Sequence, residues 1–151
     1  MSASTSSSDR WDRALRAGLH LDTRFALLLV MLLAASFTLS SIPDVDPWPG
    51  PLVEAFFNAM HVPLFGAVAF CSYKALAKGR ELSIPAMALA FVASLAYALF
   101  DEWHQSFVFG RNASLSDVIV DVIGAGLMLL AIGSWTLLRA RRTRTPAETR
   151  S

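Results

Sequence analysis

The sequence predicts an all-α fold, an integral membrane bundle of four helices. The chain has 151 residues, of which 54% are hydrophobic, and its mean hydropathy of +0.48 is high for a water-soluble domain of this size. Four long apolar runs are separated by short polar or proline-rich stretches. All but one of the basic residues flank the same side of these runs, which is expected for an even number of membrane spans.

The first apolar run, residues 25–42, contains no charged residue and is long enough to cross a hydrocarbon core of about 30 Å. Residues 1–24 before it are rich in serine and then in arginine, which predicts a disordered, basic tail. The arginines also allow a second interpretation, in which the run is a signal peptide cleaved near residues 35–40. The long basic leader and the lack of a clear small-x-small site favour a retained helix.

The second apolar run, residues 52–76, follows a proline-rich stretch at residues 43–51 that excludes regular helix and predicts an exposed loop. Three polar side chains interrupt this run at helical spacing: Glu54, Asn58 and His61. They share one face of a helix because they are four and three residues apart. Pro63 leaves two arrangements open, an interfacial helix that turns into the bilayer there or one kinked helix over the whole run.

The third and fourth spans are predicted at residues 84–100 and 118–138. The third is uncharged and rich in alanine and serine, which suit close helix packing. In the fourth, three glycines again indicate close approach of a neighbouring helix: Gly124, Gly126 and Gly133.

The start of the fourth helix carries a capping pattern. Ser114 is the predicted N-cap, and Asp117 three residues later makes a variant of the capping box. The chain therefore divides into a basic cytoplasmic N-terminus at residues 1–24, a four-span domain at residues 25–138 and a flexible basic cytoplasmic tail at residues 139–151.

The distribution of charge orients the predicted bundle. Of the 13 lysine and arginine residues, only Arg111 lies on the side opposite the termini. The positive-inside rule then places both termini in the cytoplasm. Tryptophans agree, because Trp48 and Trp103 fall near the outer boundary and Trp11 and Trp135 near the inner one. Since the arginines are explained as topology signals, no nucleic-acid partner is expected.

Most of the polar chemistry lies in residues 100–126, FDEWHQSFVFGRNASLSDVIVDVIGAG, between two strongly apolar segments. Ionisable side chains beside lipid-exposed segments are costly and usually functional. The candidate site residues are His61, Asp101, Glu102, His104, Gln105, Arg111, Ser114, Asp117 and Asp121. If the third helix continues through Gln105, Asp101 and Gln105 share a face. Asp121 lies about one turn inside the apolar run, where a carboxylate should be protonated or paired.

Three chemistries fit these residues. In the first, Glu102 or Asp117 acts as acid or base with His61 as partner, while Arg111 binds a phosphate or carboxylate group. The other candidates, Asp101, His104, Gln105, Ser114 and Asp121, would then contact the substrate. In the second, His61, His104, Glu102 and Asp117 ligate a divalent metal, but no HExxH or similar spacing supports this, so no cofactor is expected. In the third, Arg111 pairs with Glu102 or Asp117 and the polar cluster is structural.

The stretch DEWHQSFVFGRNASLSDVIVDVIGAG resembles the signature of the VanZ-like family of small bacterial membrane proteins, in which Asp-Glu is followed by Gln, Gly-Arg, Ser and Asp before a glycine-containing last helix. MHVPLFGAVAF is similar to an earlier histidine segment of that family, so the resemblance covers residues 58–130. It implies four membrane-spanning helices and the bacterial plasma membrane. One founding member is associated with low-level resistance to the glycopeptide teicoplanin. The matching positions are His61, Asp101, Glu102, Gln105, Arg111, Ser114 and Asp117.

The chain departs from the family pattern at two places. The family usually has Asp-Lys shortly before the histidine, where this chain has Phe57 and Asn58, and it usually has Asn where this chain has Asp121. A missing cation and an added carboxylate make the predicted outer site more acidic. This favours metal or proton chemistry over anion binding.

Two functions follow as expectations, and the residues leave open whether the protein is an enzyme. The first is a membrane protein that binds or modifies a lipid-linked or cell-envelope molecule; the second is a noncatalytic envelope factor that lowers glycopeptide susceptibility or assists a partner protein. The expected partners are membrane lipids or a lipid-linked envelope intermediate, and nothing in the pattern specifies a protein partner or a homo-oligomer. A proton-coupled transporter using Asp121 is disfavoured, because four short spans leave little room for alternating access.

Overall fold

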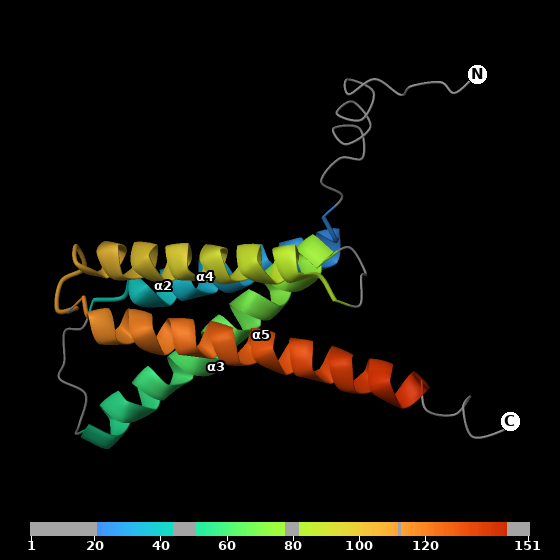
Figure 1. Ribbon diagram of the computed structural model, residues 1–151. Helices are drawn as coiled ribbons and strands as arrows, with labels where there is room; N and C mark the ends of the chain where they lie inside the picture. Colours follow the sequence, from blue (N-terminus) through green and yellow to red (C-terminus); the bar gives the residue numbers. More distant parts are fainter. Residues whose placement is uncertain (1–20, 44–50, 78–81, 112, 145–151) are drawn as a thin grey trace, which may run out of the picture.

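The computed structural model describes residues 21–43, 51–77, 82–111 and 113–144, with side chains for all of these except 51–58 and 144. Within these ranges the chain forms four helices, α2 (Thr23–Ser40), α3 (Pro51–Ala77), α4 (Ile84–Gln105) and α5 (Leu115–Arg144), and no strand (Figure 1). Each helix contains a segment long and apolar enough to cross a membrane. The shortest, α2, has 18 residues and at about 1.5 Å per residue approaches the roughly 30 Å of a hydrocarbon core. The prediction of an all-α, four-span fold is confirmed.

The helix starts follow local capping rules. Asp22 is the N-cap of α2, where its carboxylate accepts a hydrogen bond from the N–H of Arg24 at 3.1 Å. The helix therefore begins at Thr23, two residues before the predicted span. Pro51 opens α3 rather than closing the preceding loop as predicted, because proline fits the first helical position, where its missing N–H is not needed.

Two helices settle alternatives that the sequence left open. Of the two arrangements around Pro63, the structure has the single continuous helix, α3. Helix α4 continues through Gln105, which the shared face of Asp101 and Gln105 requires.

Helix α5 corrects a prediction, because it continues to Arg144, into the segment that was expected to be a flexible tail. Arginine and alanine favour helix, and no proline lies between residue 138 and Pro146. Nothing therefore ends the helix where the apolar run ends.

Helix α3 is central to the bundle. It packs against each of the other three helices, most extensively against α5, whereas α2 and α5 have no contact with each other in the described residues. In Figure 1, α3 crosses α5 obliquely, and α2 and α4 run beside each other. Helices α2 and α4 end, and α5 begins, at one end of the bundle, which we call the polar end. We call the opposite end, where α2 begins and α5 ends, the basic end.

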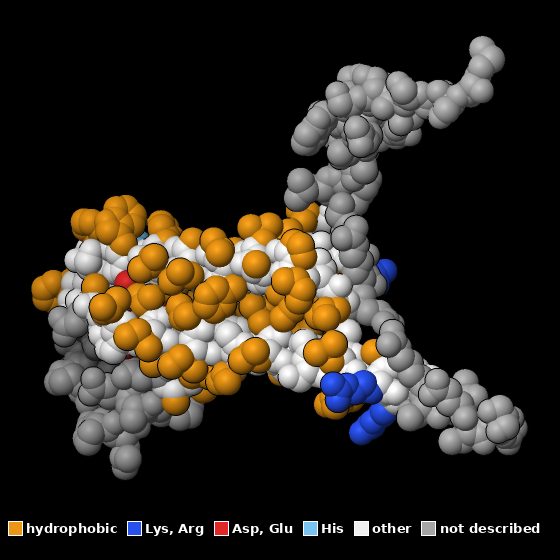
Figure 2. All heavy atoms as spheres, viewed as in Figure 1, with side chains coloured by type: hydrophobic (Ala, Val, Ile, Leu, Met, Phe, Trp, Pro, Cys, Tyr) orange, Lys and Arg blue, Asp and Glu red, His pale blue; other side chains and the backbone are white. Residues whose placement is uncertain are grey.

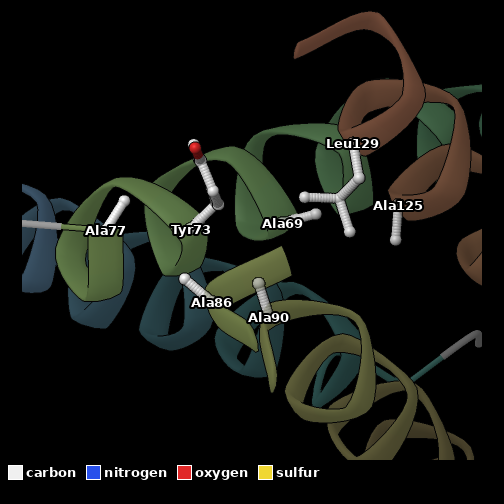
Figure 3. Packing of buried hydrophobic residues seen from close by; sticks show 7 residues of the cluster. All are labelled: Ala69, Tyr73, Ala77, Ala86, Ala90, Ala125 and Leu129. Carbon is white, nitrogen blue, oxygen red and sulfur yellow. The ribbon is translucent and has the colours of Figure 1, made fainter. Parts of the chain in front are cut away.

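The buried core is made mainly of small side chains. One cluster joins α3, α4 and α5 through Ala69, Tyr73, Ala77, Ala86, Ala90, Ala125 and Leu129 (Figure 3). A second cluster, nearer the polar end, contains Phe65, Ala98 and Val118. Small residues let helix backbones approach closely, which supports packing where the surrounding lipid is as apolar as the core.

The buried face of α4 explains why polar side chains lie inside the bundle. Ala86, Ala90, Ser94 and Ala98 repeat every fourth residue and are all buried. Asp101, Glu102 and Gln105 continue that same face by one further turn and are also buried, at 2%, 7% and 6% exposure. The predicted polar face of α4 is therefore turned toward the neighbouring helices.

The surface is apolar along the middle of the bundle and charged at its ends. Large exposed apolar side chains occur on α2, α4 and α5, and Figure 2 shows them covering the middle of the visible face, with Lys and Arg at one end. Trp103 and Trp135 are both exposed and belong to the polar and basic halves of the bundle. Trp11 and Trp48 lie outside the described residues. So do residues 1–20 and 145–151 of the predicted tails.

Candidate functional site

A histidine–carboxylate pair joins α3 to α5 near the polar end. His61 Nδ1 lies 2.9 Å from Asp121 Oδ1. The Asp121 side chain is 1% exposed and the His61 side chain 27%. Asp121 is therefore a buried carboxylate with a specific partner, and the expectation that it should be protonated or paired is met by pairing. Among the residues whose side chains are described, His61 Nε2 has no hydrogen-bond partner, and the His61 side chain as a whole is partly exposed.

Gly124 sets the distance between the two helices at this pair. A Cβ on Gly124 would lie 2.9 Å from the Cα of Val62, which is closer than real Cβ atoms approach. Val62 follows His61, and Gly124 lies about one turn beyond Asp121, so the closest backbone approach of α3 and α5 is beside the pair. The prediction of close approach is confirmed at Gly124. Gly126 and Gly133 instead meet side chains of α4 at 3.8 and 3.5 Å, ordinary packing distances.

The surroundings of the pair are acidic on one side and aromatic on the other. Asp101 and Asp117 lie within electrostatic range of the His61 imidazole. The ring of Phe65, one turn along α3, is parallel to the imidazole with centroids 6.5 Å apart. Phe65 is fully buried. The imidazole thus has a buried carboxylate as its hydrogen-bond partner and a buried aromatic ring nearby.

Glu102 connects the end of α4 to the start of α5. Its Oε2 accepts a hydrogen bond of 2.6 Å from the backbone N–H of Ser114. Ser114 in turn caps α5, because its Oγ accepts from the N–H of Ser116 at 3.2 Å and also contacts the Ser116 hydroxyl. The predicted N-cap is confirmed. The second half of the capping box differs from the prediction, since the carboxylate bound to the N–H of Ser114 is that of Glu102 on another helix rather than that of Asp117.

Asp101 connects α4 to the end of α2. Its Oδ1 accepts from the hydroxyl of Ser40 at 2.8 Å and its Oδ2 from the amide of Gln105 at 3.0 Å. Both carboxylate oxygens of this buried side chain are therefore satisfied, as burial of a charge requires. Sequence reasoning missed Ser40, because a serine at the end of an apolar run carries no signal that points to a carboxylate on another helix.

Arg111 lies in the connection between α4 and α5 and binds the end of α2. Its Nε donates to the carbonyl of Ile42 at 3.3 Å and its Nη2 to the carbonyl of Leu39 at 3.2 Å. The last carbonyls of a helix lack intrahelical donors and attract positive charge, so the guanidinium caps α2. The ion pair with Glu102 or Asp117 that the structural interpretation expected does not occur among the described residues. Arg111 remains exposed.

The remaining candidate residues make few side-chain hydrogen bonds within the described part of the chain. His104 packs against Phe37 with ring centroids 4.3 Å apart and ring planes tilted by 38°, and its buried Nδ1 has no hydrogen-bond partner among the described atoms. Asp117 lies in the first turn of α5, where a carboxylate complements the helix dipole. The side chains of Glu54, Phe57 and Asn58 lie outside the described residues. The face that Glu54 and Asn58 were predicted to share with His61 is therefore known only by its backbone.

No metal site is formed by the described residues. No three of the His, Cys, Asp and Glu side chains in residues 21–43, 59–77, 82–111 and 113–143 come close enough together to hold an ion. His61 and Asp121 form a pair of potential ligands, and Glu102 is bound to Ser114. The candidate residues form three separate hydrogen-bonded groups, around Asp121, Asp101 and Glu102, and Arg111 joins none of them.

The fold and the site together define a class of protein. The chain has four long apolar helices with buried polar groups at one end, as a small multi-pass integral membrane protein does. The VanZ/LLP1 family model matches residues 4–138. The chain therefore belongs to the VanZ/LLP1 family. Searches among curated proteins and among solved structures found no match.

Proposed function

We propose that this protein binds a lipid-linked or cell-envelope molecule at its polar end and that the His61–Asp121 pair moves a proton during modification of that molecule. The observation that carries the proposal is the 2.9 Å contact between His61 Nδ1 and a carboxylate that is 1% exposed. Burying a carboxylate inside a membrane helix is costly unless the carboxylate is paired, and such residues usually mark functional sites. The VanZ/LLP1 membership supports a membrane role and leaves the substrate to be found by experiment.

The geometry suits general acid–base chemistry at Nε2. A carboxylate on Nδ1 fixes the orientation and tautomer of an imidazole and stabilises its protonated form. Nε2 then takes a proton from a bound group or gives one to it. The acid–base role first expected of Glu102 or Asp117 passes in this proposal to His61, with Asp121 as its partner, because Glu102 already accepts the N–H of Ser114. Asp117, one turn before Asp121, adds negative charge near the imidazole.

Arg111 remains the candidate for binding an anionic group. Two of its N–H groups bind the carbonyls of α2, and a guanidinium has five in all. The side chain is exposed, so the other donors are free to bind a phosphate or carboxylate. In this proposal Arg111 holds the anionic part of the molecule while His61 acts deeper in the bundle.

The proposal includes the location of the site. With both termini in the cytoplasm of a bacterium, the polar end would face away from the cytoplasm. The charge distribution supports this orientation, because Arg24, Lys74 and the four arginines of α5 lie toward the basic end and Arg111 is the only described basic residue toward the polar end.

The test uses purified full-length protein in lipid nanodiscs with radiolabelled envelope lipids. Wild-type protein is expected to convert a labelled lipid, and His61→Gln and Asp121→Asn are expected to lower the rate by about 10²- to 10⁴-fold. Glu102→Gln is the matched control, because an amide oxygen still accepts the N–H of Ser114, and it should keep most of the activity. Equal loss in all three variants would contradict a specific role for the pair.

A noncatalytic function is the second candidate, and one observation favours it. Asp101, Glu102 and Arg111 all bind groups on other helices or loops, so their contacts are those of a structural network. If no labelled lipid changes while His61→Gln still removes a glycopeptide-resistance phenotype in cells, the protein acts by binding or by assisting a partner. Loss of the phenotype together with loss of conversion would support catalysis.

A further inference from the structure

The end of α4 and the segment that connects it to α5 carry a group of exposed aromatic rings. Phe100, Trp103, Phe107 and Phe109 are 44%, 61%, 72% and 78% exposed, and we call them the aromatic rim. Three of the rings lie next to one another: Phe100 and Trp103 are 5.9 Å apart between centroids, and Trp103 and Phe107 are 5.2 Å apart. The rim faces away from the buried carboxylates, because Asp101 and Glu102 occupy the opposite side of α4.

Several backbone N–H groups in this connection are paired by local hydrogen bonds. The N–H groups of Ser106, Phe107, Val108 and Arg111 donate to the carbonyls of Glu102, His104, Gln105 and Val108. The hydroxyl of Ser106 donates to the carbonyl of Trp103 at 2.6 Å. Each of these pairs removes a donor and an acceptor that would be costly to leave unpaired in lipid. The paired part of the connection is therefore better suited to partial immersion than an open loop would be.

The rim continues the apolar surface of the membrane-spanning part. Val92 and Leu99 on α4 are 57% and 50% exposed, and Trp103 lies on the same helix face, eleven residues after Val92 and four after Leu99. Arg111, at the end of the same connection, is exposed and positively charged. Aromatic rings next to a cation match the boundary between acyl chains and phosphate groups, where tryptophan is enriched.

We propose that the aromatic rim docks into the headgroup boundary of the phospholipid bilayer and fixes the depth of the polar end in the membrane. The occupant of this surface is lipid, not a protein partner. One consequence concerns the His61–Asp121 pair. Asp121 lies six residues after Leu115, the first residue of α5. At about 1.5 Å per residue, this places it about 9 Å further along the helix. The pair then lies below the headgroups, where a molecule reaches it from the membrane.

The experiment measures the depth of single tryptophans by fluorescence quenching. In a full-length variant with all four native tryptophans changed to phenylalanine, one tryptophan is returned at position 103 or introduced by Phe107→Trp or Phe109→Trp. Val92→Trp is the matched reference, because it lies on the same face of α4 about 16 Å nearer the membrane centre. Each protein is placed in vesicles of phosphatidylcholine brominated either near the headgroup or near the chain end, and acrylamide serves as the aqueous quencher.

The three rim tryptophans are expected to be quenched more by bromine near the headgroup than by bromine near the chain end, and to be protected from acrylamide. Val92→Trp should show the opposite order of the two bromolipids. Retained α-helical circular dichroism shows that a variant is folded, and the native Trp103 tests the proposal without any new side chain in the rim. Strong acrylamide quenching at positions 103, 107 and 109, with no effect of either bromolipid, would overturn the proposal and indicate water or a protein partner on this surface.

Discussion

At the scale of single residues, Glu102 shows how a buried carboxylate can be used to hold two helices together. Its side chain lies on the buried face of α4 at 7% exposure and binds the N–H of Ser114 at the start of α5. The first N–H groups of a helix have no intrahelical acceptor, and a charged acceptor binds them more strongly than a neutral one. The turn between α4 and α5 is thereby closed by an interaction between the two helices.

Removal of this acceptor should destabilise the bundle. For Glu102→Ala we expect a loss of about 1–3 kcal/mol in the free energy of unfolding, because the partly buried N–H of Ser114 is left without a partner. Glu102→Gln keeps an acceptor oxygen and should cost clearly less. Unfolding of the detergent-solubilised protein, followed by circular dichroism, measures both. Equal stabilities of the two variants would show that the hydrogen bond contributes nothing.

Sequence reasoning identified the residues near the polar end but not their partners. Charged side chains beside apolar runs are conspicuous, so His61, Glu102, Arg111 and Asp121 could be named in advance. The partners of Glu102 and Arg111 are backbone N–H and carbonyl groups, which every residue carries and no motif specifies. The His61–Asp121 pair joins residues 60 positions apart, and several other acids were equally plausible partners before the helix packing was known.

At the scale of helices, α2 is held to the bundle by polar contacts near its end. Ser40 binds Asp101, and Arg111 binds the carbonyls of Leu39 and Ile42. Nearer the middle of α2, the hydroxyl of Tyr97 donates to the carbonyl of Leu33 at 2.9 Å. Through these contacts α2 supplies hydrogen-bond partners to three side chains, those of Asp101, Arg111 and Tyr97.

The Arg111 contact predicts a local change in α2. In Arg111→Ala the carbonyls of Leu39 and Ile42 lose the guanidinium donors, and the amides of Ser41 and Ile42 should exchange hydrogen faster because the final turn frays. The amides at the start of α2 should be unaffected. Hydrogen–deuterium exchange with mass spectrometry measures this, and Arg139→Ala, at an exposed arginine of the basic end, is the control. Unchanged exchange at the end of α2 would contradict the capping role.

The packing of α3 against α5 predicts a difference between two glycines. Gly124→Ala places a methyl group 2.9 Å from the Cα of Val62, so the helices must separate, and we expect a loss of about 1–3 kcal/mol in stability. Gly133→Ala meets only the end of the Met87 side chain at 3.5 Å and should be close to neutral. Thermal unfolding in detergent compares the two. Equal tolerance at both positions would mean that α3 and α5 do not approach closely at Gly124.

The extent of the helices was predictable because apolar length is a direct requirement for crossing a bilayer. All four helices begin within three residues of the predicted spans. The extension of α5 to Arg144 was missed because the end of an apolar run marks a membrane boundary and does not by itself end a helix. The continuity of α3 through Pro63 was left open because a proline can either kink or end a helix, and the surrounding packing decides which.

At the scale of the whole molecule, charge and packing give the two ends different characters. Buried carboxylates gather toward the polar end, and exposed arginines gather at the basic end (Figure 2). The central position of α3 could not be predicted, because four apolar runs of similar length give no indication of which one the others surround. It follows from the small residues of α3, α4 and α5 in the buried core.

The proposed orientation predicts the side from which each end can be labelled. In a Cys71→Ala background, Ala113→Cys at the polar end should react with a membrane-impermeant maleimide on intact cells. Thr143→Cys at the basic end should react only after the membrane is opened. Both positions are exposed, so access depends on the side of the membrane alone. The reverse pattern would place the polar end in the cytoplasm.

The pairing of His61 with Asp121 is tested most directly by nitrogen-15 NMR of histidine-labelled protein in nanodiscs. The chain has three histidines, so the imidazole signals can be assigned by single substitutions. We predict that Asp121→Asn changes the ring nitrogen shifts of His61, which bonds to Asp121, and leaves those of His104 unchanged, because the described atoms show no bond between His104 and Asp121. If the His61 signals are the same with and without the Asp121 carboxylate, the pair does not form and the proposed proton transfer has no basis.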